Sequence, residues 1–387
     1  MKRKLHLTAT LITVFSAQLG LGQLSGDHAF MIGDYVEIGI NGEGYEGAPL
    51  DDAIPTHYRG FAEKLGFIAN PAEDGWIEYN GDFYMPGTPE NGFGITYTKS
   101  SGDTVSFGNN AAWLYEIPGE ITDYIESVDS VSVIWVGLTP DSLQMTVRYD
   151  LQKDQHYYTT TISLLNIGSE TFTDVYYYRN LDPDVNQDIS WGFATDNAIE
   201  SQSGMADDSV RVVASQDEAW LAEMIFHAYG PEWKGYVGGF YNRDGQKLWN
   251  GVDVIILEGF EGYGDNSIGI AYNVASLPPG RSGSEVFSFG TAFKRGIVFE
   301  TEPGDTESIQ ENEIEFSIYP NPTEGDFFTI EIVGQFSYRL IDAKGSVIMS
   351  GQGNGLTKVN LSTIENGNYF IELIQDGALT TSTLIIK

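Results

Sequence analysis

Apolar and polar residues alternate along most of this chain, and this pattern predicts β-strands. One alternating run covers residues 143–149, a polar turn follows at 153–155, and a second run covers 157–165. Together they predict an antiparallel hairpin. Residues 172–178 predict a third strand after a turn rich in Asn, Gly and Ser.

The remaining stretches before residue 300 have the same character. Residues 267–272 and 285–293 predict two more strands, and 218–229 fits a helix or a buried strand equally well. The sequence has no clean repeat at a fixed period, which disfavours a solenoid or a propeller. The fold expected for residues 23–299 is therefore a large antiparallel β-sandwich, or two sandwiches packed together.

The end of the chain forms a second, smaller unit in this pattern. Proline cannot donate to a central strand, so Pro320 and Pro322, on either side of Asn321, mark where this unit begins. Short alternating runs separated by turn-forming residues follow, and they predict a small all-β sandwich over residues 314–387. The preceding residues 300–313 are acidic and almost without apolar side chains, which is typical of a disordered linker.

The motifs of this last unit resemble those of a known export signal. Their order is similar to that of the type A C-terminal sorting domain carried by cargo of the Bacteroidetes type IX secretion system. The resemblance covers about the last fifth of the chain and rests on Tyr319, Pro320, Asn321, Pro322, Gly367 and Tyr369. It implies an immunoglobulin-like β-sandwich, handling by the type IX machinery, and an extracellular or outer-membrane surface location after the sorting domain is removed.

The first residues have the features of a secretory signal peptide. Residues 1–4 carry three positive charges, and 5–21 are mostly apolar. Small residues before Gln23 predict cleavage near Gly22. A membrane anchor is the alternative, but the apolar run is broken by polar residues and is marginal in length for a bilayer. No other stretch is apolar enough to span, so no membrane span is expected in the mature protein.

Charge and composition exclude several classes of function. The chain has 55 acidic and 20 basic residues and a net charge of −35, which becomes −38 if the leader with its three basic residues is removed. Such acidity disfavours general binding to nucleic acid or to an anionic membrane. The chain has no cysteine, which excludes a thiol nucleophile, a thiolate zinc site and an iron–sulfur cluster.

An acidic stretch after residue 181 is the sharpest candidate for a metal site. Oxygen-bearing side chains recur at every second position, at Asp182, Asp184, Asn186 and Asp188. Calcium needs six to eight oxygen ligands, which a curled loop can supply from alternate residues. The stretch departs from an EF-hand, because Gln187 and Phe193 replace the glycine and the bidentate glutamate. The alternative is a turn whose side chains bond the local backbone.

Aromatic residues suggest a carbohydrate-binding surface. Trp191 and Trp233 are the tryptophans expected to be exposed, because they adjoin the acidic stretch and Pro231 respectively. Aromatic rings on loops can stack on sugars, although aromatics more often fill β cores. Arg179 ends a strand, and it could face a ligand or pair with Asp182 or Asp184.

Catalytic motifs are few. The sequence has no nucleophile elbow, no zinc-protease motif and no phosphate-binding loop. If the chain were a polysaccharide lyase, Tyr178, Arg179 and His156 would be the first candidates. A glycosidase also stays open, since the sequence cannot select its carboxylate pair.

The leading hypothesis is an exported binding or adhesion protein, with polysaccharide as its ligand and calcium as a structural support. A polysaccharide-degrading enzyme and a structural surface protein are the alternatives.

Overall fold

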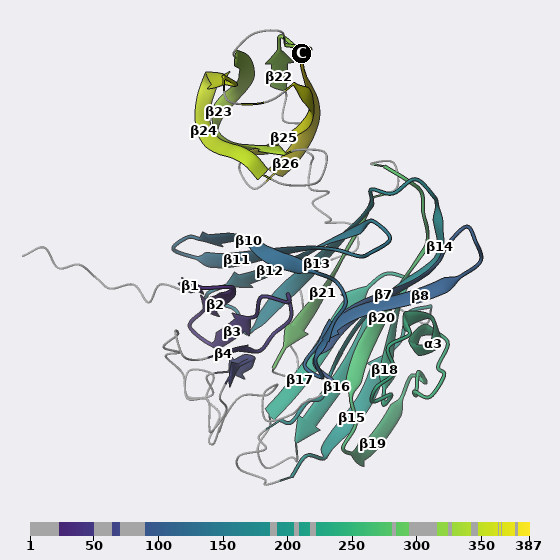
Figure 1. Cartoon of the computed structure of the whole chain (residues 1–387). Coiled ribbons are helices and arrows are strands. Elements are labelled where there is room, and N and C mark those ends of the chain that lie inside the picture. The colour runs from purple at the N-terminus through teal and green to yellow at the C-terminus, as the bar shows by residue number, and fades with distance from the viewer. Residues whose placement is uncertain are drawn as a thin grey trace, which may run out of the picture. The chain divides into compact units, whose positions relative to one another are not determined.

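The computed structural model describes two compact units, Met1–Glu300 and Thr301–Lys387. The described residues are 23–49, 64–69, 90–185, 192–204, 209–216, 222–280, 284–293, 316–323, 327–341, 347–362, 364, 366–375 and 378–387. The prediction of an all-β chain is confirmed, with several antiparallel sheets (Figure 1). Within the described part of the chain, no helix is long and apolar enough to cross a membrane.

The larger unit contains a nine-stranded antiparallel sheet. Its strands, in spatial order, are β10 (Gly119–Glu126), β11 (Ser130–Leu138), β12 (Leu143–Gln152), β13 (Tyr157–Asn166), β21 (Glu285–Ala292), β17 (Ala222–Tyr229), β16 (Ser209–Gln216), β15 (Thr195–Ser201) and β19 (Phe260–Gly264). The predicted hairpin is confirmed as β12 and β13, with Leu143 opposite Asn166. For 218–229, the described residues form the strand β17, and 218–221 lie outside the described residues.

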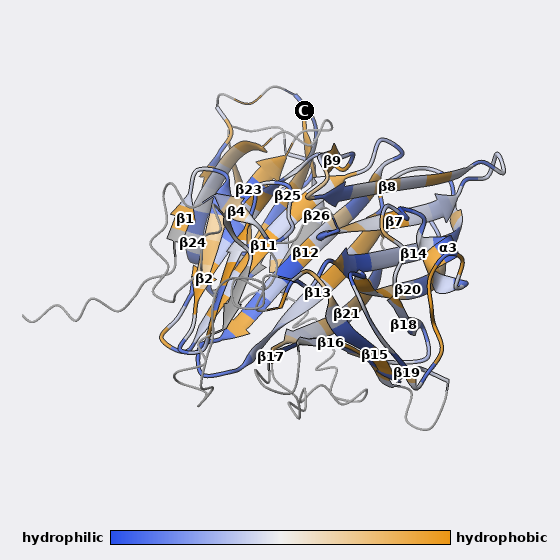
Figure 2. Ribbon diagram, turned by 90° about the horizontal axis from the view of Figure 1, so that it is seen from below, coloured by the Kyte–Doolittle hydropathy of each residue, from blue (hydrophilic) through white to orange (hydrophobic). Residues whose placement is uncertain are grey.

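A six-stranded sheet packs against the first. Its order is β18 (Trp233–Val237), β20 (Ile268–Leu277), β14 (Phe172–Leu181), β7 (Gly92–Thr98), β8 (Thr104–Asn110) and β9 (Leu114–Tyr115). The predicted third strand is confirmed as β14, but it belongs to this sheet and not to that of the hairpin. Tyr177 of β14 lies 5.3 Å from Phe287 of β21, ring to ring, so the core is the interface between the sheets. Hydrophobic and hydrophilic residues alternate along β11 and β12 in Figure 2.

Smaller elements border these two sheets. A four-stranded sheet contains β1 (Gln23–Ser25), β2 (His28–Ile32), β3 (Val36–Ile40) and β6 (Phe67–Ala69), and β4 (Ala48–Pro49) pairs with β5 (Lys64–Leu65). The short helix α3 (Gly245–Trp249) lies over the outer face of β14, β20 and β7. It begins where the Asp244 carboxylate accepts hydrogen bonds from two backbone amides of its first turn.

The smaller unit is a separate five-stranded β structure. Its strands are β22 (Phe316–Tyr319), β23 (Phe327–Ile341), β24 (Val347–Asn360), β25 (Gly367–Gln375) and β26 (Ala378–Ile386). It has its own core, which includes Phe328, Leu340, Ile371 and Leu384. Asn321 fastens the start of this unit to β26, because its side chain donates to the carbonyl of Thr383 and accepts from the amide of Ile385.

Candidate functional site

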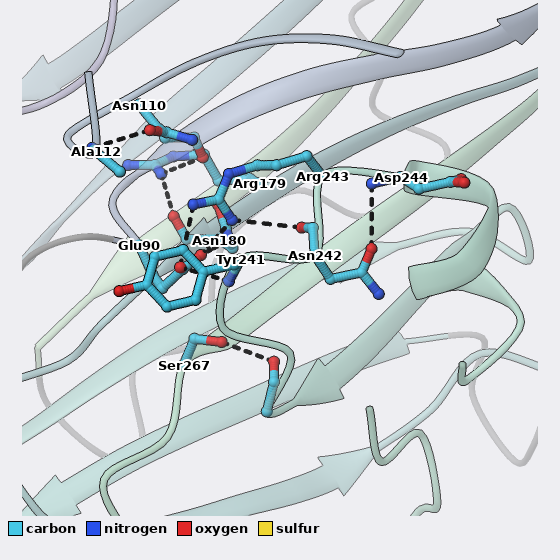
Figure 3. Close-up of polar contacts among 12 residues, drawn as sticks. Glu90, Asn110, Ala112, Arg179, Asn180, Tyr241, Asn242, Arg243, Asp244 and Ser267 are labelled. Atoms are coloured by element: carbon cyan, nitrogen blue, oxygen red, sulfur yellow. Dashed lines mark hydrogen bonds and ion pairs between the residues drawn. The ribbon is translucent and has the colours of Figure 1, made fainter. Parts of the chain in front are cut away.

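Glu90, just before β7, is the anchor of a polar cluster at one end of the six-stranded sheet. Its carboxylate is fully buried and accepts two hydrogen bonds from the Arg243 guanidinium, at 2.5 and 3.1 Å. It also accepts from the Tyr241 amide at 2.7 Å and from Asn180 Nδ2 at 2.8 Å. Figure 3 shows Glu90 beside Arg243, Tyr241 and Asn180. The segment 238–244 is thereby fixed at the end of β7.

A second segment is fastened to the adjacent residue. The carbonyl of Asn91 accepts a hydrogen bond from the Ala111 amide at 2.9 Å. The Asn110 side chain then accepts from the Ala112 amide, also at 2.9 Å, and this bond turns the chain after β8. The segments 110–113 and 238–244 are therefore attached to consecutive residues, Asn91 and Glu90.

Each segment displays one aromatic side chain in a left-handed backbone conformation. Trp113 has φ 62° and is 84% exposed, and Tyr241 has φ 64° and is 71% exposed. Bulky residues rarely adopt positive φ, because the Cβ atom meets the backbone there. Such strain persists only where surrounding contacts impose it, and it is concentrated at functional sites. We call Trp113 and Tyr241 the aromatic surface.

The sequence did not identify this surface. Trp113 follows the turn-forming pair Asn109 and Asn110, and Tyr241 follows Gly238 and Gly239. These turn-forming residues, a few positions before each ring, were the available signal, because a turn ends a strand and places the side chains that follow outside it.

Arg179 is buried rather than exposed to a ligand. It forms an ion pair with Glu46, and each side chain is 1% exposed. Its guanidinium also donates to Asn91 Oδ1 and to the Gly92 carbonyl, both at 2.6 Å. The sequence suggested either a ligand or a pairing with Asp182 or Asp184, and the structure pairs Arg179 with Glu46, which is distant in the sequence.

The three residues suggested for a lyase lie in three different environments. Tyr178 and Arg179 are neighbours in β14 and therefore point to opposite faces of the sheet. Tyr178 is buried against Tyr236 and Leu248 on the outer face, and burial raises the pKa of its hydroxyl well above its usual value. His156 stacks on Tyr35, with ring centroids 4.0 Å apart. The structure therefore does not assemble a Tyr–Arg–His site.

The two tryptophans chosen from the sequence do not form an exposed surface among the described residues. Trp233 is 1% exposed, so the prediction that it is exposed is wrong. It lies in β18 and packs edge-on against Tyr272 and Phe287, at 4.8 and 5.5 Å between ring centroids. Trp191 lies outside the described residues.

Asp182 and Asp184 form a buried acidic pair immediately after β14. They are 6% and 1% exposed, and Asn186 and Asp188 lie outside the described residues. Burial, followed by the charges of Asp265 and Glu90, raises the pKa of Asp182 to about 7. Burial, followed by the charges of Asp182 and Asp265, raises the pKa of Asp184 to about 8. Both carboxylates therefore resist ionisation in the folded protein.

The turn that holds this pair is closed by the backbone. The amide of Asp184 donates to the carbonyl of Asp182 at 3.1 Å, and that of Val185 donates to the carbonyl of Pro183 at 2.7 Å. Among the described residues, no group of three or more acidic or histidine side chains is placed to hold a metal ion.

Comparison with known proteins identifies the smaller unit. Residues 317–387 match the family described as secretion system C-terminal sorting domain. This segment is a type IX secretion sorting domain. The sorting domain contains all six motif residues named from the sequence, Tyr319, Pro320, Asn321, Pro322, Gly367 and Tyr369. A sorting domain of this kind implies export to the cell surface or the extracellular space.

The other comparisons give only distant similarities. No curated protein matches the chain. A polysaccharide lyase is 12% identical, with a TM-score of 0.30 over 94% of this chain and 47% of the lyase. A heparan sulfate lyase from Pedobacter heparinus is 9% identical (TM-score 0.28; 65% and 29% covered). The GH36 α-galactosidase AgaB from Geobacillus stearothermophilus is 8% identical (TM-score 0.33; 71% and 41% covered). The chain spans less than half of each protein, and scores this low carry no functional argument.

Proposed function

We propose that this is an exported binding protein that holds polysaccharide on the aromatic surface, Trp113 and Tyr241. The observation that carries the proposal is that both rings are exposed on segments attached to Glu90 and Asn91, in backbone conformations that large side chains normally avoid. The export that the sorting domain implies would bring this surface into contact with extracellular polymers.

Aromatic rings suit this role physically. Trp and Tyr offer large, rigid, amphipathic contact areas, and little conformational entropy is lost when they bind. Hydrogen bonds fix the backbone on both sides of the aromatic surface, since the Tyr241 amide is bound by Glu90 and the Ala111 amide by Asn91. The backbone that carries the rings is therefore fixed before the ligand arrives, which favours affinity.

The charge distribution favours a neutral glycan. Arg243 lies 5.9 Å from the Tyr241 ring centroid, but its guanidinium is held by both oxygens of Glu90. The chain as a whole carries a net charge of −35, which repels polyanions. Stacking on uncharged sugars is therefore the interaction that this surface supports best.

Binding to insoluble neutral and acidic polysaccharides tests the proposal. The full chain is incubated with each polymer, and the protein retained and any new reducing or unsaturated sugar ends are measured. We expect retention on at least one neutral polymer without new ends. New ends would instead support an enzyme. Neither retention nor new ends on any polymer would contradict the proposal and favour a structural role.

A further inference from the structure

Three alternate residues at the end of β14 present buried oxygens that lack hydrogen-bond partners. Asn180, Asp182 and Asp184 are 1%, 6% and 1% exposed. Asn180 Oδ1, Asp182 Oδ1 and both carboxylate oxygens of Asp184 have no partner within the described part of the chain. Asn180 uses its other side-chain atom, Nδ2, to donate to Glu90. We call these three residues the oxygen cluster.

A buried oxygen without a partner is costly, and a buried carboxylate is costlier still. The nearby charged groups that act on the pair do not offset this cost, because Asp265 and Glu90 are also acidic. Arg243 is the cation bound to Glu90. The described residues form no ion pair with Asp182 or Asp184. The cluster therefore has an excess of buried acceptor atoms, and a cation would supply their missing partner and favour the ionised form of the two carboxylates.

We infer that Asn180, Asp182 and Asp184 bind a calcium ion. The three residues lie within five positions of the sequence, and the backbone turn at Asp182–Val185 keeps the two carboxylates beside the end of β14, where Asn180 lies. Calcium accepts carboxylate, amide, backbone carbonyl and water oxygens in irregular arrangements, whereas magnesium demands a near-ideal octahedron. Two carboxylates and one amide oxygen from this cluster would be completed by carbonyl and water oxygens.

This inference does not depend on the proposed function. Asn180 links the oxygen cluster to Glu90, which also holds Tyr241 and Arg243. Calcium would therefore support the segment 238–244 whether or not the aromatic surface binds a glycan. A result that contradicts one proposal does not contradict the other.

Calcium titration into chelator-treated full chain tests the site. All seven tryptophans precede residue 300, so tryptophan fluorescence reports the unfolding of the larger unit alone. We expect heat of binding by calorimetry, and a rise in Tm of about 5 °C at a calcium concentration near 100 times the Kd. Magnesium at equal concentration is expected to give a smaller rise.

Two variants locate the site. Asp184→Asn is expected to weaken calcium binding at least about tenfold, because ligand charge tunes affinity. Asp174→Asn is the matched control, since Asp174 is an exposed acidic residue of β14, the strand that precedes the cluster, and it should keep wild-type affinity. If Asp184→Asn fails to fold, Asp182→Asn is measured in the same way.

Three results would overturn the inference. They are the absence of both binding heat and a Tm shift, an equal Tm rise from sodium chloride of matched ionic strength, and unchanged affinity in Asp184→Asn.

Discussion

Arg179 and Glu46 form an ion pair that is buried inside the larger unit, with both side chains 1% exposed. Arg179 belongs to β14 of the six-stranded sheet, and Glu46 also accepts a hydrogen bond from Tyr158 of β13 at 2.8 Å. Glu46 therefore connects the two sheets of the sandwich. The basic residue that the sequence suggested for ligand binding is part of the framework.

Glu46→Gln should destabilise the larger unit strongly. Gln keeps the shape of the side chain but removes its charge, so the buried Arg179 cation loses the ion pair with Glu46. Such a loss costs about 3–5 kcal/mol. Urea unfolding followed by tryptophan fluorescence measures it. Glu200→Gln breaks the partly exposed pair with Arg211 and should cost less than about 1 kcal/mol. Equal effects of the two variants would contradict this role of Glu46.

Tyr178→Phe should leave stability almost unchanged. Within the described part of the chain, the buried Tyr178 hydroxyl has no hydrogen-bond partner, so its removal deletes no bond. Tyr158→Phe is the comparison, because that hydroxyl donates to the Glu46 carboxylate, and its loss should cost about 1.5–3 kcal/mol. The urea unfolding midpoints of the two variants, each compared with that of the wild type, measure the two costs. A larger cost for Tyr178→Phe would mean that its hydroxyl has a role not accounted for.

Stability in the presence of a chelator should fall as the pH rises from about 4 to about 8. Asp182 and Asp184 have raised pKa values in the folded protein, about 7 and about 8, against about 3.9 in the unfolded chain. The folded state therefore holds protons that the unfolded chain releases, and raising the pH favours unfolding. Each such proton contributes at most about 1.4 kcal/mol per pH unit, and the two groups titrate as a pair.

Urea unfolding at several pH values checks this dependence. Asp184→Asn removes one member of the pair and should flatten the slope, whereas Asp174→Asn should not. An equal slope in the wild type and in Asp184→Asn would show that the two carboxylates do not titrate as described.

The local pattern of apolar and polar residues was sufficient to predict the strands but not to predict which sheet each strand joins. The hairpin of β12 and β13 followed from alternation and a polar turn, because both signals lie within a short stretch. The assignment of β14 to the opposite sheet depends on pairing with β7 and β20, which are distant in the sequence. Such pairing leaves no mark on β14 itself.

Exposure of single side chains was the least predictable property. Trp233 looked exposed beside Pro231, yet it faces Phe287 across the core. Trp113 is exposed because the loop that contains it is tied to Asn91, a contact that sequence cannot show. Asp182 and Asp184 were selected for their spacing, but their burial depends on the surrounding fold.

Loss of the aromatic surface is the most direct test of glycan binding. On a polysaccharide that retains the wild-type full chain, Trp113→Ala and Tyr241→Ala should each weaken binding by about 1–3 kcal/mol, or roughly 5- to 150-fold in Kd. Trp113→Phe, which keeps a ring, should recover part of the loss. Tyr263→Ala removes an equally exposed ring from β19 of the other sheet and should bind as wild type does. Wild-type affinity in both Trp113→Ala and Tyr241→Ala would contradict the account.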